Sequence, residues 1–262
     1  MIPSATHLVI IPSFDSGSLL FETVRAARAA WAPIWVVIDG STDGSDRPVR
    51  DLAARDPWLR VLDLPRNSGK GAALAHGLGA ALDAGFTHAL TMDADGQHPA
   101  TRIPAFMAAS IEHPDALISG LPEFGVDAPS LRVRGRRISN AWARIETLGQ
   151  GARDSLFGFR VYPIRPLLRI MRGTRWMRRF DFDPEASVRL SWAGVPALDL
   201  AAPVRYLRAE DGGVSHFRYG RDNLLLTWMH IRLMLEWLLR WPWLTVRRYR
   251  LAGSASPDGI SS

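Results

Sequence analysis

The chain has 262 residues, of which 47% are hydrophobic and 22% are charged. This balance is typical of a globular protein with a large core and suits one α/β domain with elaborations. Cysteine is absent, which excludes disulfides and thiolate chemistry. The formal net charge of +6 points to an anionic partner, for which nucleic acid, anionic lipid and a phosphorylated substrate all qualify. The first residues lack the basic segment and long apolar stretch of a signal peptide, so we expect a cytoplasmic protein.

Strand-like and helix-like segments alternate along the first half of the chain. Apolar runs typical of strands lie at residues 7–11, 34–38, 60–64, 89–92 and 116–119. Helical periodicity covers residues 18–31, 46–54, 70–84 and 101–113, and Ser18 is the expected N-cap of the first. This alternation predicts an α/β fold with a doubly wound, mostly parallel sheet and helices on both faces. Ligands bind such sheets beyond the carboxyl ends of the strands.

The segment 90–99, LTMDADGQHP, places two carboxylates and an amide where an apolar strand ends. Asp93, Asp95 and Gln97 occupy alternate positions and therefore share a face. Their oxygens are ligands of hard cations such as Mg²⁺ or Mn²⁺, which commonly bind through one or two carboxylates plus substrate phosphates. We predict a divalent-cation site at these three residues. The alternative is a loop rich in turn-forming residues without any ligand.

Two further polar segments follow strand-like runs. Asp39, at the end of one run, is expected to accept hydrogen bonds from a nucleobase or ribose, unless residues 39–45 form only a turn. Lys70 is the only lysine of the chain and opens a helix, where backbone N–H groups also favour phosphate. Residues 67–71 lack the spacing of a Walker A loop. Lys70 is therefore expected to contact a phosphate group, or else to be an exposed lysine at a helix start.

Three ordered motifs carry a resemblance to a known family. Residues 10–15 (IIPSFD) resemble V-P-x-Y-N-E, residues 36–44 (VVIDGSTDG) resemble V-x-D-D-G-S-x-D-G, and residues 92–99 (MDADGQHP) resemble M-D-A-D-x-Q-H-P-P. Over roughly residues 7–220 the chain is similar to the family 2 glycosyltransferases of the GT-A fold, particularly the polyprenyl-phosphate sugar synthases. Ile38 replaces the first Asp of the second motif, and Ser16 stands where Glu is usual.

The resemblance implies a role for several residues on the donor side. In the family, an Asp of the second motif holds the nucleotide base, while the paired Asp residues and the following Gln hold the metal and the sugar diphosphate. Together with Lys70, the nucleotide-sugar residues are then Pro12, Phe14, Asp39 and Asp93, and the metal ligands are Asp93, Asp95 and Gln97.

Acceptor-side residues are implied in the second half of the chain. Residues 154–160 (DSLFGFR) are similar to D-x-x-x-G-F-R, and residues 180–185 (FDFDPE) to an acidic segment of the family. Asp154 is the favoured base or orienting group, and Asp181 comes next. The acceptor itself is expected at Arg137, Ser139 and Arg160, although an arginine-rich solvated helix face is an equal alternative around the first two. Asp183 and Glu185 are interpreted as a helix start.

The C-terminal part differs in character from the predicted catalytic domain, residues 1–220. Residues 221–251 predict an amphipathic helix rich in tryptophan and arginine, whose ionisable residues argue against a membrane span. Such a helix suits the interface of an anionic bilayer, or it packs on the catalytic domain or a dimer partner. Residues 252–262 are expected to be a disordered tail.

These observations predict an inverting enzyme that moves a sugar from a nucleotide-diphosphate sugar to a lipid-linked acceptor. The acceptor is a polyprenyl phosphate or the hydroxyl of an amphipathic lipid, a divalent cation assists, and the enzyme lies on the inner face of the membrane. A sugar-phosphate nucleotidyltransferase would carry a Gly- and Arg-rich loop after the first strand, which residues 12–15 lack. A non-catalytic membrane-docked scaffold would not need the acidic residues. Nucleic acid is not expected as a partner, because the arginines are scattered and no recognition motif occurs.

Overall fold

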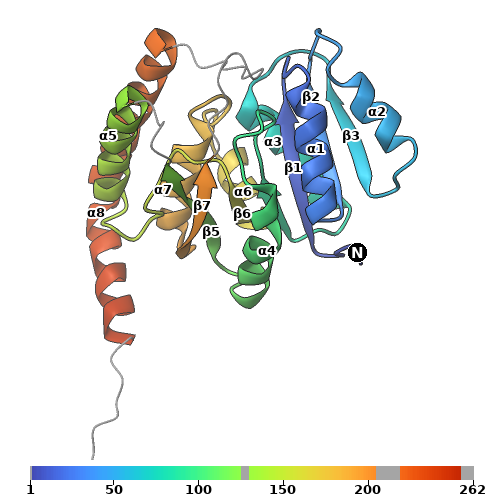
Figure 1. Cartoon of the computed structure of the whole chain (residues 1–262). Helices are drawn as coiled ribbons and strands as arrows, with labels where there is room; N and C mark the ends of the chain where they lie inside the picture. Colours follow the sequence, from blue (N-terminus) through green and yellow to red (C-terminus); the bar gives the residue numbers. More distant parts are fainter. Residues whose placement is uncertain (1, 125–129, 205–218, 255–262) are drawn as a thin grey trace, which may run out of the picture.

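The computed structural model describes residues 2–124, 130–204 and 219–254. Its centre is a sheet of seven strands in the order β3-β2-β1-β4-β6-β5-β7 (Figure 1). The strands are β1 (His7–Ser13), β2 (Ile34–Asp39), β3 (Leu59–Leu64), β4 (His88–Thr91), β5 (Leu117–Phe124), β6 (Arg160–Pro163) and β7 (Ala197–Val204). Strand β6 pairs antiparallel with β4 and β5, whereas the other pairs are parallel. The predicted α/β fold with a mostly parallel sheet is confirmed.

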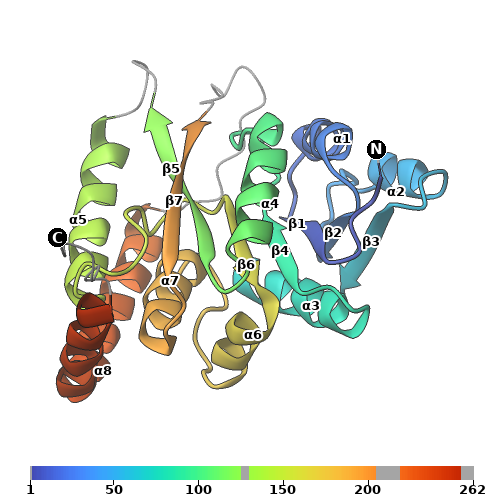
Figure 2. The same ribbon diagram turned by 90° about the horizontal axis from the view of Figure 1, so that it is seen from below.

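Helices cover both faces of this sheet. They are α1 (Leu19–Ala30), α2 (Arg47–Ala53), α3 (Lys70–Asp83), α4 (Ile103–Glu112) after a short 3₁₀ turn (Ala100–Arg102), α5 (Ser130–Glu146), α6 (Ile164–Arg172), α7 (Phe182–Ala193) and α8 (Tyr219–Ser254). In the view from below, α1, α2 and α4 lie on one side of the strands and α3, α6 and α7 on the other (Figure 2). Ser18 is the N-cap residue of α1, but its side chain makes no capping hydrogen bond.

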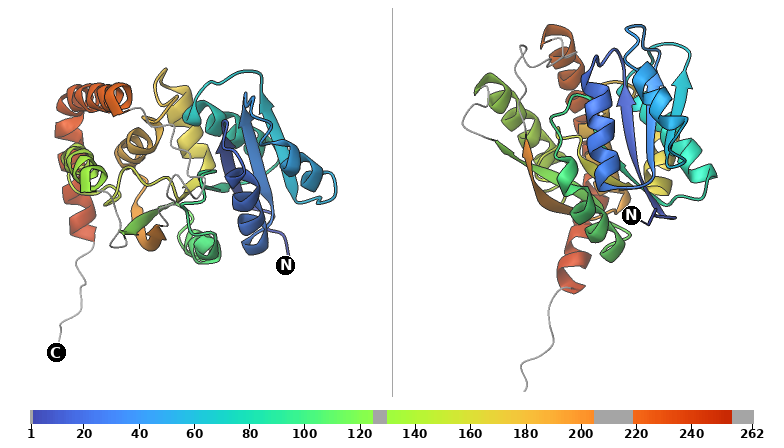
Figure 3. Two further views of the ribbon diagram at one scale, coloured as in Figure 1. Left: turned by 45° about the horizontal axis from the view of Figure 1, so that its top comes forward. Right: turned by 45° about the vertical axis from the view of Figure 1, so that its right-hand side comes forward.

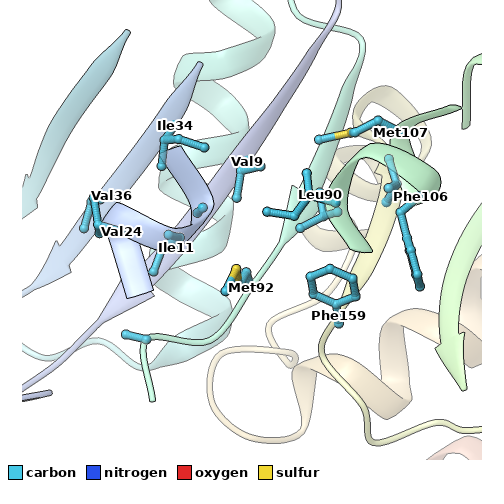
Figure 4. Packing of buried hydrophobic residues seen from close by; sticks show 14 of the residues in the cluster. Val9, Ile11, Val24, Ile34, Val36, Leu90, Met92, Phe106, Met107 and Phe159 are labelled. Atoms are coloured by element: carbon cyan, nitrogen blue, oxygen red, sulfur yellow. The ribbon is translucent and has the colours of Figure 1, made fainter. Parts of the chain in front are cut away.

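The two faces of the strands build two separate hydrophobic clusters. Val9 and Ile11 of β1 pack with α1 and α4 on one face (Figure 4), whereas Leu8 and Ile10 pack with α3 on the other. Because strand side chains alternate between faces, a strand covered on both sides must be apolar at every position. This explains why the strands were visible in the sequence as continuous apolar runs.

Helices α5 and α8 lie side by side beyond the end of the sheet (Figures 1 and 3). Met229 and Leu233 of α8 pack with Ala143 of α5 and with Val188 and Trp192 of α7 in a third, smaller cluster. The C-terminal helix thus packs along one side on α5 and α7. It runs three residues beyond the predicted end at 251, to Ser254, and residues 255–262 of the predicted tail lie outside the described part of the chain. No helix within the described residues is long and apolar enough to cross a membrane.

Two histidines stack at the amino-terminal edge of the sheet. The rings of His7 and His88 are 4.5 Å apart at 8°, and His7 Nε2 lies 3.1 Å from the hydroxyl of Ser110. Burial, followed by the neighbouring His88, lowers the pKa of His7 from 6.5 to about 4. The unfolded chain therefore binds a proton more readily than the folded one. Stability from this residue is complete above pH 6.5 and is lost as the pH falls toward 4.

We therefore expect His7→Gln to reduce the loss of stability on acidification. Glutamine can still bond to Ser110 but does not titrate, so the variant should lose less free energy of unfolding between pH 6.5 and 4, by on the order of 3 kcal/mol. Urea unfolding of both proteins at pH 7, 5.5 and 4 measures this difference. Parallel pH profiles of the two proteins would show that His7 does not limit acid stability.

Candidate active site

Asp39, the last residue of β2, fixes the loop that leads into α3. Its Oδ1 accepts the backbone N–H of Ser68 at 2.8 Å and its Oδ2 that of Gly69 at 2.7 Å. Gly40 follows at φ +69°, and a Cβ there would lie 2.6 Å from the backbone of Arg66. Only glycine allows this approach of the two loops. The structure thus places Asp39 at the predicted edge with its carboxylate already bonded to backbone, and a direct contact with the nucleotide base stays a prediction.

The turns after β1 and β2 are joined to each other at the same edge. Asp15 Oδ1 accepts the backbone N–H of Thr42 at 2.7 Å, and Asp43 Oδ2 accepts that of Gly17 at 3.0 Å. The half-buried Pro12 and Phe14, both expected at the nucleotide, lie at the end of β1 and at the start of this joined region. Asp15 stands where the first motif has Asn, and its carboxylate bonds the two loops to each other.

Lys70, at the first position of α3, lies between two carboxylates. Its Nζ is 2.7 Å from Asp93 Oδ1 and 2.6 Å from Asp183 Oδ2. Burial would lower the pKa of Lys70, but Asp183 and Asp93 outweigh it and raise that pKa, so the ammonium stays charged. Burial likewise opposes ionisation of Asp93, and Lys70 outweighs it and lowers the pKa of Asp93. Lys70 is therefore not an exposed lysine at a helix start.

Gly158 makes room for this cluster. A Cβ on Gly158 would lie 2.6 Å from Lys70 Nζ and 3.3 Å from both Asp93 Oδ2 and Asp183 Oδ1. Its carbonyl accepts a hydrogen bond from the hydroxyl of Thr91 on β4 at 2.7 Å. The glycine of the sequence motif 154–160 is thus required because three charged groups pack against its Cα.

The acidic turn after β4 carries the predicted metal ligands. Asp95 Oδ1 accepts the backbone N–H of Gln97 at 3.0 Å, and His98 Nδ1 accepts that of Asp93 at 2.9 Å. Burial and the charge of Asp93 raise the pKa of Asp95. His98 packs against Phe157 with ring centroids 4.7 Å apart, and burial lowers its pKa. Sequence reasoning gave His98 no role, although it belongs to the motif.

The donor set of this turn fits a hard divalent cation that takes further ligands from a substrate. Within the described ranges, no group of three or more His, Cys, Asp or Glu side chains is arranged to hold a metal. Two like-charged carboxylates, Asp93 and Asp95, nevertheless lie close enough for one to raise the pKa of the other. A cation between them would remove this repulsion. Mg²⁺ commonly binds through one or two carboxylates together with substrate phosphates, which is what this turn can offer.

Asp154, a predicted acceptor-side residue, has both carboxylate oxygens hydrogen-bonded. Its Oδ1 accepts Arg136 Nη1 at 2.6 Å and the backbone N–H of Phe157 at 2.8 Å, and its Oδ2 accepts Asn140 Nδ2 at 3.0 Å. Burial raises the pKa of Asp154, but Arg136 and the hydrogen bonds outweigh it, so the pKa is lowered. The carboxylate is therefore ionised and orients Arg136 of α5.

Arg160, expected to bind the acceptor, has a fully buried side chain. Nη1 donates to Tyr162 Oη at 3.2 Å and to the carbonyl of Asp183 at 2.7 Å, and Nη2 donates to the carbonyl of Asp154 at 2.9 Å. Both Nη atoms donate to groups inside the protein. Arg160 therefore fixes the backbone at Asp154 and Asp183 and does not reach the surface.

Asp181 and the two predicted acceptor residues of α5 have different surroundings. Both oxygens of Asp181 accept backbone N–H groups, from Met177 at 3.0 Å and from Arg179 at 2.9 Å. Arg137 is exposed on α5, whereas Ser139 is buried, with its hydroxyl 2.9 Å from Nε2 of His230 on α8. Ser139 therefore joins α5 to α8 and does not share a surface with Arg137. A catalytic role of Asp181 stays a prediction.

The strand order and the acidic turn at the carboxyl edge of a mostly parallel sheet define an α/β protein of the GT-A type. The chain belongs to glycosyltransferase family 2, because the family described as "Glycosyl transferase family 2" matches residues 8–180, more than half of its length. It is therefore a glycosyltransferase.

The chain is similar to two curated proteins that act on polyprenyl phosphates by name. An undecaprenyl-phosphate mannosyltransferase of Micrococcus luteus is 27% identical over 210 residues, which cover 78% of this chain and 85% of that protein. A polyprenol monophosphomannose synthase of Mycolicibacterium smegmatis is 29% identical over 166 residues, covering 61% of this chain and 62% of that protein. The chain thus spans less than two thirds of the second relative.

Solved structures share the fold at low sequence identity. A glucosyl-3-phosphoglycerate synthase from Mycobacterium tuberculosis, in complex with Mn²⁺, UDP-glucose and phosphoglyceric acid, superposes with a TM-score of 0.59 at 14% identity, covering 89% of this chain and 80% of that one. A mannosyltransferase from Pyrobaculum calidifontis, in complex with GDP-mannose and Mn²⁺, gives a TM-score of 0.57 at 17% identity, covering 98% and 79%.

The bonding of Asp39 makes a prediction for stability. Asp39→Ala leaves two backbone donors without their partner at a buried position, which should lower the free energy of unfolding by about 1–3 kcal/mol. Asp46→Ala is the control, because Asp46 forms a more exposed ion pair with Arg50 at the start of α2. Equal denaturation midpoints for Asp39→Ala and the parent would mean that the loop does not depend on this carboxylate.

Proposed function

We propose that this enzyme transfers a sugar, with inversion, from a nucleotide-diphosphate sugar to a polyprenyl phosphate with the help of a divalent cation. The observation that carries this proposal is the cluster of Lys70, Asp93 and Asp95 at the carboxyl edge of the sheet. The names of the two curated relatives, which are polyprenyl-phosphate mannosyl transferases, support the acceptor class. The solved complexes with Mn²⁺ and nucleotide sugars support the donor class and the cation.

The donor side must stabilise the charge that develops on the departing diphosphate. We assign the cation, Mg²⁺ or Mn²⁺, to Asp93, Asp95 and Gln97; when bound, it would neutralise part of that charge. Lys70 offers a second, fixed positive charge within the same cluster. A charge that is already in place needs no reorganisation during the reaction, which is why such groups contribute much of the rate.

The state of Asp154 favours a phosphate acceptor over a hydroxyl. A general base works best when its pKa lies near the working pH, and the pKa of Asp154 is lowered. A phosphate monoester, with a second pKa of about 6, is already anionic at neutral pH and needs no base. Asp154 instead orients Arg136, whose guanidinium suits a phosphate group. A nucleotidyltransferase or a non-catalytic scaffold gains no support from any of these contacts.

Asp95→Ala tests the cation assignment. The variant should lose at least about 100-fold in kcat, because the charge on the leaving diphosphate would no longer be neutralised. A chelator should abolish transfer by the parent, and Mn²⁺ or Mg²⁺ should restore it. Transfer from UDP- or GDP-sugars to a short-chain polyprenyl phosphate is the assay, with circular dichroism to confirm folding. Full turnover of Asp95→Ala in chelator would refute the assignment.

A lipid-borne acceptor requires that the enzyme meet the membrane. Helices α5 and α8 carry many large apolar side chains that are exposed. Helix α8 exposes Leu239 to 86% and Leu235 to 59%, and α5 exposes Ile138 to 63%. We call this set the outer α5–α8 face. Its members, all large, apolar and exposed, are Ile138, Trp142, Ile145, Leu224, Trp228, Ile231, Leu235, Leu238, Leu239, Trp241, Trp243 and Val246.

The outer α5–α8 face fits an anionic lipid surface. The exposed tryptophans suit the boundary between headgroups and acyl chains, and the net charge of +6 attracts anionic lipid. Arg232, however, binds Glu185 at 2.8 Å, and Trp237 packs partly against the third core cluster, so neither residue faces lipid. We place the enzyme peripherally on the inner, cytoplasmic face of the membrane. The side chains of residues 247–250 lie outside the described part of the structure.

Replacing Trp228, Leu235 and Leu239 with Ser should weaken binding to vesicles of phosphatidylglycerol by at least about tenfold, because three apolar side chains no longer enter the interface. The matched control carries Trp58→Ser and Ile111→Ser, which remove exposed apolar residues elsewhere, and should bind like the parent. Co-sedimentation measures binding, and light scattering measures the oligomeric state. Unchanged vesicle binding with loss of a dimer would assign the face to a second copy of the chain.

A further inference from the structure

Asp183, interpreted from the sequence only as part of a helix start, pairs with Lys70 beside the expected metal ligand Asp93. It is the second residue of α7, it is 5% exposed, and its Oδ2 lies 2.6 Å from Lys70 Nζ. The same ammonium lies 2.7 Å from Asp93 Oδ1. One positive charge is thus shared between an expected metal ligand and a carboxylate from a distant helix.

The sharing determines the net charge that a cation would meet. If Lys70 paired with Asp93 alone, it would neutralise that carboxylate, and an ion-paired carboxylate is a poorer ligand for a second cation. Asp183 supplies the compensating negative charge. With Asp95 included, the four groups carry two net negative charges, which match one divalent cation. Such a match counts most in a partly buried place, where water screens charges weakly.

The position of Asp183 is also fixed by its surroundings. Its backbone carbonyl accepts Arg160 Nη1 at 2.7 Å, and its Oδ1 lies against Gly158. Among the described residues, Oδ1 is buried and has no hydrogen-bond partner. Among the described residues, the carboxylate of Asp183 is thus bonded to Lys70 alone, through Oδ2.

We propose that Asp183 is a positioning residue of the cation site: by sharing Lys70 with Asp93, it keeps the Asp93 carboxylate available to a divalent cation. This inference rests on the proposed function, since it takes Asp93 and Asp95 as the cation ligands. Partners in the second shell of metal sites typically change metal affinity about 10–100-fold when they are removed. The effect should therefore appear in cation binding itself, without donor or acceptor.

The test is the binding of Mn²⁺ alone to the full chain, with free Mn²⁺ followed by electron paramagnetic resonance. Asp183→Asn should weaken binding by about tenfold. Adding Lys70→Gln to this variant should restore binding toward that of the parent, because the site regains two net negative charges. A purely structural role of Asp183 predicts the opposite, since a second lesion in the cluster would add to the first.

Two further variants separate the outcomes. Lys70→Gln alone should bind Mn²⁺ more tightly than the parent, and this result does not depend on whether Asp183→Asn folds. Asp63→Asn, which removes an exposed carboxylate paired with Arg50, should bind Mn²⁺ like the parent. Unchanged affinity in a folded Asp183→Asn, or weaker binding by Lys70→Gln, would overturn the inference and leave the proposed function standing. Absence of Mn²⁺ binding by the parent, or binding that survives Asp95→Ala, would overturn the cation assignment and this inference with it.

Discussion

The ion pairs of Lys70 with Asp93 and Asp183 are the interaction on which the rest of the site depends. They join the start of α3, the turn after β4 and the start of α7, three segments that are far apart in the chain. Removing charges from water is costly, and breaking a buried pair leaves an uncompensated charge behind. The surroundings therefore have to match the cluster closely. Gly158 is one consequence, because any side chain there would displace the ammonium.

The sequence predicts the first half of the fold well and the second half poorly. Strands β1 to β5 and helices α1 to α4 follow from apolar runs and helical periodicity, because the central strands β1, β2 and β4 are buried at nearly every position. Strand β6 has four residues and begins with Arg160. This arginine is buried but charged, so a search for apolar runs does not find the strand. Strand β7 is partly exposed along most of its length, so its apolar signal is weak. Both depend on neighbours that only the tertiary structure supplies.

The residues of the candidate site were likewise predicted only in part. Sequence reasoning brought Asp39, Lys70 and the acidic turn to one edge, because the carboxyl ends of parallel strands must meet there. It could not find the partner of Lys70, which lies 113 residues away, nor the bond between Ser139 and His230 across two helices. It could not show that Arg160 is buried, since an arginine beside a predicted acceptor-side residue gives no sign of burial in the sequence. Long-range pairing of polar groups is set by packing, which leaves no periodic trace in the sequence.

In the proposed function, helix α5 links the expected acceptor site to the expected membrane contact. One side of it presents Arg136 and Asn140 to Asp154, and the other side exposes Ile138 and Trp142. An α-helix is about 10–12 Å across, so a surface that contacts the outer side lies within a few side-chain lengths of the inner one. A bilayer in contact with the outer α5–α8 face is then separated from Arg136 by the thickness of this one helix. In this proposal the helix that carries Arg136 also sets how deeply the enzyme sits in the bilayer. Acceptor recognition and membrane contact are therefore expected to change together.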